Sequence, residues 1–287
     1  TLEFLDASGR SIKKFMSRAP EPAPQQPPGA GAPPLTPPEQ PQAPSGEEVQ
    51  ATGGGAQVRL TADEGLNRFV WDLRYPDASR FPGLILWEGQ LRGPRAVPGM
   101  YQARLTVNGK TLTQSFEVKK DQRLATSDAD FARQFELLLK IRDKLTETHD
   151  AITQIREVRR QVDDLVKRVR DQPNSKAILD AAKSLNAKMT TVEETLYQTK
   201  NQSSQDPLNF PIRLNNKLAA VAGVVDSAET APTEQSYTVY EEQVSKINAQ
   251  LQQLEQIMRT DLAAFNQLVR EQNIPAVIVK PQAGGKR

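Results

Sequence analysis

The residues best suited to chemistry lie in one stretch, GLNRFVWDLRYPDASRFPG, at positions 65–83. It concentrates aromatic, arginine and aspartate side chains in a chain that is only 6% aromatic. A catalytic site built on Asp72, Arg74 and Asp77 would need a further carboxyl group at a defined separation and a pocket. The alternative makes Trp71 a core aromatic, with Asp72 and Arg74 facing outward or pinning a loop. We favour this second interpretation and expect no catalytic residue here.

Few other side chains offer reactive chemistry. The chain has no cysteine and one histidine, His149, which excludes disulfides, thiolate chemistry and any site that needs two histidines. His149 lies between Leu145 and Ile152, on or beside an apolar helical stripe, where we expect a packing residue with satisfied hydrogen bonds. No Gly-rich phosphate loop and no nucleophile motif is present. The sequence therefore predicts no catalytic residue, no metal site and no cofactor.

The charges give no reason to expect nucleic acid or an anionic membrane as a partner. The 37 basic and 35 acidic residues are interspersed and leave a net charge of +2. The most basic run, residues 156–170, is interrupted by Glu157, Asp163 and Asp164, and it contains no aromatic residue for stacking on bases. We interpret it as a solvated helix face with intrahelical ion pairs. The sequence contains no apolar run of about 20 residues, so it predicts no transmembrane segment.

Residues 1–125 have the pattern of a β-rich domain. Asn108-Gly109, a strong hairpin signal, separates two stretches in which apolar side chains alternate. Short strands, tight turns and one buried Trp predict a small antiparallel immunoglobulin-like β-sandwich. The alternating side chains are Phe69, Trp71, Leu73 and Tyr75, then Tyr101, Ala103, Leu105 and Val107, then Leu112, Gln114, Phe116 and Val118.

Residues 19–56 interrupt that domain. They hold 11 of the 21 prolines, so they cannot bury enough apolar surface to order the segment. We expect an extended or disordered insertion exposed to solvent. The alternative is a docking strip, because PPEQP has the spacing of polyproline ligands.

Residues 126–274 change to helical periodicity. Apolar residues recur at spacings of three and four, and three Pro-containing breaks (DQPNS, QDPLNFP and TAPTEQ) divide the region into four helices. We expect an antiparallel four-helix, coiled-coil-like bundle with a two-helix stalk, which makes the chain α+β. If the helices alternate in direction, the fourth ends beside the sandwich. Residues 275–287 would then supply a C-terminal strand, which ties the domains together, and a basic tail.

Three segments carry a resemblance to a known family: LEFLDASGRSIKKF, GLNRFVWDLRYP and GPRAVPGMYQARLTVNGKTLTQSFEV. Together they resemble the immunoglobulin-like domain of the flagellar hook-capping type. More broadly, the chain is similar to the C-terminal region of secreted bacterial BNR-repeat or sortilin-type β-propeller proteins, often labelled glycosyl hydrolases. The resemblance implies a secreted or cell-envelope location and a propeller upstream of Thr1. It carries no catalytic residue across, since the Asp-box pattern is absent.

Two functions stay open on this basis. The first is a non-enzymatic interaction and assembly module, which joins the propeller to protein partners or to the cell surface. The second is an ancillary, carbohydrate-contacting region of a hydrolase whose active site lies upstream. The candidate surface contacts are Trp87, Arg92 and Arg95.

Overall fold

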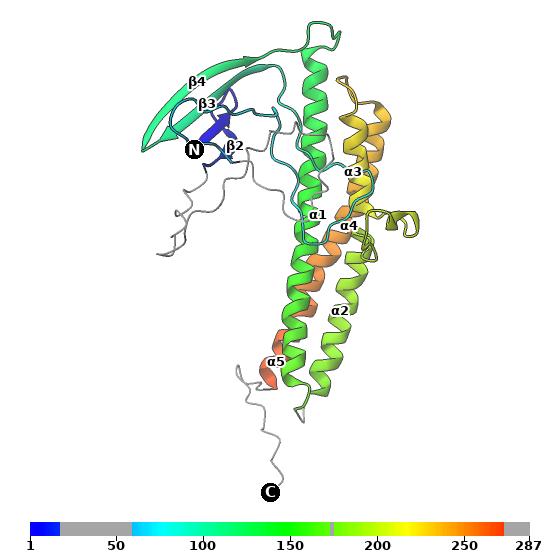
Figure 1. Ribbon diagram of the computed structural model, residues 1–287. Coiled ribbons are helices and arrows are strands. Elements are labelled where there is room, and N and C mark those ends of the chain that lie inside the picture. The colour runs from blue at the N-terminus through cyan, green and yellow to red at the C-terminus, as the bar shows by residue number, and fades with distance from the viewer. Residues whose placement is uncertain (18–58, 173–174, 273–287) are drawn as a thin grey trace, which may run out of the picture. The chain divides into compact units, whose positions relative to one another are not determined.

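The structure is a computed structural model that describes residues 1–17, 59–172 and 175–272 (Figure 1). It has the expected α+β class, with a small antiparallel four-stranded sheet and a set of long helices. The chain divides into two compact units, of which the first is Thr1–Trp71 with Met100–Glu117 and the second is Asp72–Gly99 with Val118–Arg287.

In this division the sheet unit is discontinuous in the chain, whereas the sequence predicts one continuous domain over residues 1–125. Residues 72–99, which we call the 72–99 loop, leave the sheet unit and return to it at Met100. The predicted insertion at 19–56 and the predicted C-terminal strand and tail at 275–287 lie outside the described residues.

The first unit is a sheet with strand order β2-β1-β3-β4. β1 pairs antiparallel with both β2 and β3. The predicted hairpin at Asn108-Gly109 is confirmed, and both turn residues have positive φ, at 49° and 77°. The strands are β1 (Leu2–Leu5), β2 (Ser11–Phe15), β3 (Gly99–Val107) and β4 (Lys110–Val118).

The strand predicted over residues 69–75 does not form. Phe69 and Trp71 lie in irregular backbone, yet their rings pack on the sheet: Trp71 stacks on Phe4 with ring centres 4.3 Å apart, and the ring centre of Phe69 lies 4.6 Å from that of Phe15. Leu73 has φ +57°, which breaks the extended backbone that a strand needs. The alternation therefore reports aromatic packing on one face of the sheet, followed by a turn into the 72–99 loop.

The second unit contains the predicted helices, and the three predicted breaks are confirmed. Ser127 caps the first helix in a capping box with Asp130. The fourth predicted helix is one helical run that contains a π-helical turn at Ile257–Asp261. The helices are α1 (Asp128–Val169), α2 (Lys176–Leu196), α3 (Leu214–Val225), α4 (Glu234–Gln256) and α5 (Leu262–Glu271).

Side-chain pairs between helices fix their directions. Along α1, Arg159 bonds Thr190 and Asp163 bonds Asn186, so α2 runs antiparallel to α1. Gln134, near the start of α1, bonds Val225 at the end of α3, whereas His149 further along α1 contacts Asn215 at the start of α3. α3 therefore also runs antiparallel to α1.

The fourth helical run follows the same direction as α1. Lys140 of α1 interacts electrostatically with Tyr240, and Lys144 bonds Asn248 at 2.8 Å. Since α2 and α3 both run opposite to α1, one beyond the other, the expected up-down-up-down order is wrong (Figure 1). The connection between Leu196 and Leu214 contains two prolines but does not reverse the chain. The fourth run thus ends far from the start of α1.

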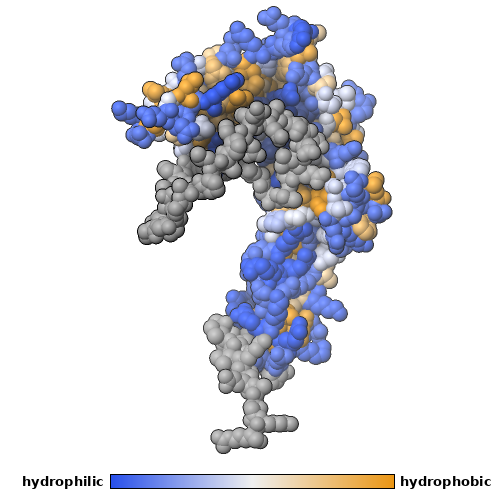
Figure 2. Space-filling model, viewed as in Figure 1, coloured by the Kyte–Doolittle hydropathy of each residue, from blue (hydrophilic) through white to orange (hydrophobic). Residues whose placement is uncertain are grey.

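The helices share one apolar core along their length. Ile141, Leu145, Ile152 and Ile155 of α1 are fully buried, as their helical spacing predicts. The visible outer face of α1 and α2 is mostly hydrophilic (Figure 2). Among the helices that the structure describes, none is long and apolar enough to cross a membrane.

Candidate functional site

The 72–99 loop runs along the helices as an irregular hairpin. Ala78 and Leu91 lie on its two arms, and the Ala78 N–H donates to the Leu91 oxygen at 2.8 Å. Both residues and Phe81 are buried in the helical core. The stretch that looked most like an active site is therefore shared by two structural tasks: residues 65–71 serve the sheet unit, and residues 72–83 serve the helical unit.

Helix side chains satisfy the main chain of this loop. Asn216 of α3 brackets Trp87: its Oδ1 accepts from the Trp87 N–H at 2.7 Å, and its Nδ2 donates to the Trp87 oxygen at 2.8 Å. The Tyr197 hydroxyl accepts from the Ile85 N–H at 3.1 Å and donates to the Gly83 oxygen at 2.9 Å. A partly buried segment without regular structure needs such partners, since unpaired main-chain groups are costly when they leave water.

His149 lies beneath the loop and is fully buried. Its Nδ1 donates to the Ser79 oxygen at 2.5 Å, because a carbonyl only accepts, and its Nε2 faces the Asn215 Nδ2 at 3.4 Å. The ring of Phe81 packs edge to face against the His149 imidazole, with the ring centres 5.2 Å apart. Burial lowers the pKa of His149 below its ordinary 6.5. The prediction of a packing histidine with satisfied hydrogen bonds is confirmed.

Three charged residues of the opening stretch, Asp72, Arg74 and Asp77, hold the loop in shape. Arg74 is buried, donates to the Gly93 oxygen at 2.8 Å and pairs with Asp226 at 2.9 Å. Asp72 accepts from the Arg74 N–H at 3.1 Å, and Asp77 accepts from the Gly93 N–H at 3.0 Å. The interpretation that Asp72 and Arg74 pin a loop is confirmed.

The arginine run on α1 is used in ion pairs. Arg156 and Arg159 both bond the buried Glu193 of α2 at 2.7 Å, one to each carboxylate oxygen. Arg160 pairs within the helix with Glu157 and Asp164. The predicted intrahelical pairs are confirmed, and two further arginines join α1 to α2.

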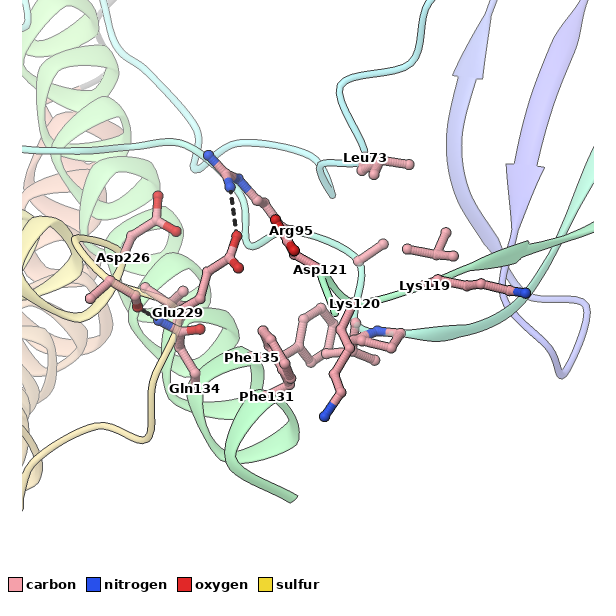
Figure 3. Close-up of a pocket in the computed structure, with 16 residues that line it drawn as sticks. Leu73, Arg95, Lys119, Lys120, Asp121, Phe131, Gln134, Phe135, Asp226 and Glu229 are labelled. Atoms are coloured by element: carbon pink, nitrogen blue, oxygen red, sulfur yellow. Dashed lines mark hydrogen bonds and ion pairs between the residues drawn. The ribbon is translucent and has the colours of Figure 1, made fainter. Parts of the chain in front are cut away.

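A cavity of about 190 Å³, which we call the Arg95 pocket, lies within the second unit (Figure 3). Phe131 and Phe135 of α1 are the aromatic residues of its lining, and Tyr75 meets Phe135 edge to face at 4.9 Å. At the rim Arg95 pairs with Glu229 at 3.3 Å, and both side chains are about half exposed. The pocket therefore combines an aromatic floor with an accessible ion pair.

Paired charges surround that floor. Asp226 is bonded to Arg74, and Asp121 is bonded to Arg123, which lowers the pKa of the Asp121 carboxyl. Gln134 closes one wall by donating to the Val225 and Ala228 oxygens at 2.7 and 2.5 Å. The carboxylates of Asp121, Asp226 and Glu229 are therefore all engaged by arginine side chains.

The three predicted surface contacts are placed differently. Arg95 lines the pocket, whereas Trp87 and Arg92 do not. Arg92 is exposed, and Trp87 is half-buried with its main chain held on α3. Phe131 and Phe135 were missed, although their spacing of four residues at the start of a helix is a recognisable pair.

In the part of the chain that the structure describes, no group of three or more His, Asp or Glu side chains is placed to hold a metal ion. Comparisons with protein-family models, with curated proteins and with solved structures find no match to this chain.

Proposed function

We propose that this chain is a non-enzymatic interaction and assembly module. One observation carries the proposal: the residues suited to chemistry have structural partners. Arg74, Asp77 and His149 each bond a main-chain group of the 72–99 loop, so their removal would release that loop. This arrangement holds a partly exposed segment on the helices, as binding modules often do.

We assign the contact surface to the Arg95 pocket. Its volume lies below the roughly 300–1,000 Å³ typical of small-molecule sites, and it suits a single large side chain. Interface hot spots are commonly aromatic or arginine anchors that enter a desolvated recess with a polar rim. The aromatic floor of Phe131 and Phe135 and the rim pair of Arg95 and Glu229 match that description.

The resemblance places this module in a larger protein as part of the same proposal. The sheet would belong to an immunoglobulin-like sandwich, and the helices would pack in the coiled-coil manner. The partner would be the propeller upstream of Thr1 or another protein of a bacterial envelope. This context rests on the residue patterns of the three segments that carry the resemblance.

Binding of the 287-residue chain to the separately produced upstream propeller, followed by calorimetry, tests the proposal. Phe135→Ala and Arg95→Glu should each weaken binding about tenfold or more, because both remove part of the anchor recess. Arg92→Glu makes the same change of charge as Arg95→Glu, but at a residue outside the pocket, and it serves as the matched control. Equal weakening by Arg92→Glu, or no binding by the parent chain, would overturn the assignment.

The carbohydrate-contacting alternative rests on Trp87, which is only half-buried. It predicts binding to a glycan array that is lost in Trp87→Ala and kept in Phe135→Ala. The interaction module predicts the reverse dependence on these two residues, and no turnover of glycosides by the chain.

A further inference from the structure

β4 (Lys110–Val118) is the last strand in the order β2-β1-β3-β4. On its outer side it has no strand partner among the residues that the structure describes. It is nine residues long, contains no proline, and is exposed over most of its length. Proteins usually guard such an edge with proline, bulges or inward charges, since an unguarded edge is a template for another strand.

The hairpin turn decides which main-chain groups face outward. The two-residue loop Asn108-Gly109 sets Thr106 opposite Thr111, and their hydroxyl oxygens lie 3.0 Å apart. In an antiparallel ladder the residues alternate between bonding one neighbour and facing the other. The outward N–H and C=O groups of β4 therefore belong to Thr111, Thr113, Ser115 and Glu117.

The sequence of this edge is close to palindromic about Gln114. In an antiparallel pair of two copies centred there, Leu112 lies opposite Phe116 and Thr113 lies opposite Ser115. Gln114 lies opposite its own copy, and the register places no like charges directly opposite each other. A shift of two residues sets Leu112 opposite Gln114 and loses this match. We propose that β4 pairs with β4 of a second copy of this chain in this register.

Exposed apolar side chains support the same partner. Leu105 and Leu112 are 41% and 73% exposed, on the sheet face whose other end carries the aromatic cluster around Phe116. In the proposed pair Leu112 would contact Phe116 of the second copy, and the apolar face would continue across both sheets. The pairing thus buries apolar surface in addition to forming a ladder.

The dimer should be weak. One strand ladder buries less than the roughly 1,200 Å² of stable interfaces, so assembly should depend on concentration in the range of transient contacts. The Gln114 amide donates to the Ser115 main-chain oxygen at 3.1 Å. In the dimer this oxygen also accepts from the second strand, so the amide has to rotate away or share the oxygen with that strand. This inference concerns a different surface from the Arg95 pocket and does not depend on the proposed function.

Analytical ultracentrifugation of the full chain across a concentration series tests the pairing. Thr113→Pro removes an outward N–H, which an edge strand tolerates, and should leave a monomer at concentrations where the parent chain dimerises. A pair of double variants tests the register. T113K/S115K sets lysines opposite each other and should weaken the dimer roughly tenfold, whereas T113K/S115E sets opposite charges together and should restore it.

These side chains lie on the exposed face of the sheet, so the variants should fold, and circular dichroism with thermal melts checks this. A parent chain that is monomeric at every concentration overturns the proposal. A dimer that survives Thr113→Pro, or one that T113K/S115E weakens as much as T113K/S115K, overturns it as well.

Discussion

The Nδ1 atom of His149 lies 2.5 Å from the main-chain oxygen of Ser79, a residue 70 positions earlier in the chain. Further bonds surround this contact. The Ser79 N–H donates to the Thr146 hydroxyl oxygen at 3.2 Å, and the Ser79 hydroxyl bonds the Thr146 main-chain oxygen at 3.3 Å and Asp150 at 3.0 Å. Three residues of α1 therefore hold one residue of the 72–99 loop.

Stability should fall as the pH drops below about 6.5. Burial lowers the pKa of His149 in the folded chain, with the Ser79 oxygen and Asp150 acting against this shift and Arg80 acting with it. The unfolded chain then binds the proton more readily, so this contribution to stability is complete above pH 6.5 and is lost as the pH falls through the folded pKa. The measurement is the free energy of unfolding in urea between pH 8 and pH 5.

His149→Asn is the control for this pH dependence. Asparagine keeps a donor near the position of Nδ1 and does not titrate, so its stability should be lower but flat over the same range. The aspartates and glutamates with shifted pKa values in the described residues are all shifted downward, and they titrate at lower pH. An equal slope in His149→Asn would rule out His149 as the source.

Asn216→Ala should loosen the 72–99 loop without unfolding the helices. The substitution leaves the part-buried Trp87 N–H and oxygen without these partners. Because an unsatisfied buried group costs about 1–3 kcal/mol and these two are only part-buried, we expect a total loss of about 1–3 kcal/mol. Amide exchange should rise at residues 85–91, and unfolding in urea should show the loss of stability. Asn209→Ala, at an exposed site, is the matched control and should change neither measurement.

The helical half was largely predictable because its signals are local. Apolar spacing and Pro-containing breaks gave the helices, and the Ser127 cap lies within the predicted start. Helix direction was not predictable in the same way. We expected the chain to reverse direction at each break. After the Leu196–Leu214 connection, however, α3 runs in the same direction as α2.

The 72–99 loop could not be predicted because its contacts are distant in sequence. Its residues bond partners such as Asn216 and Tyr197 more than one hundred positions away, and no periodicity records such pairs. Alternation at Phe69 and Trp71 correctly marked aromatic packing but wrongly implied a strand. Of the predicted contact residues only Arg95 lines the pocket, since its partners Phe131, Phe135 and Glu229 come from other elements.

Glu193→Gln should destabilise the α1–α2 contact. The buried carboxylate bonds Arg156 through one oxygen and Arg159 through the other. An amide replaces one of these oxygens with an NH₂ donor, which cannot accept from the arginine that it faces. Loss of a fully buried partner costs about 3–5 kcal/mol, but both arginines are about one-third exposed, so we expect about 1–3 kcal/mol. Glu194→Gln, next to it and exposed, is the control and should stay within about 0.5 kcal/mol in urea unfolding.

Two glycine substitutions should act in opposite directions. A Cβ atom at Gly93 would collide with the main-chain oxygens of Tyr75 and Pro76, and backbone atoms in the pinned loop cannot move aside easily. Gly93→Ala should therefore cost several kcal/mol through overpacking and through loss of the Asp77 bond.

At Gly223 in α3 the nearest atom to a new Cβ is the Gln90 Cγ at 3.6 Å, an ordinary contact. Gly223→Ala should stabilise the chain by about 0.5–1 kcal/mol, since alanine favours a helix interior. Thermal melts of both variants measure the difference, and a tolerated Gly93→Ala would show that the two arms of the loop do not pack as closely as described.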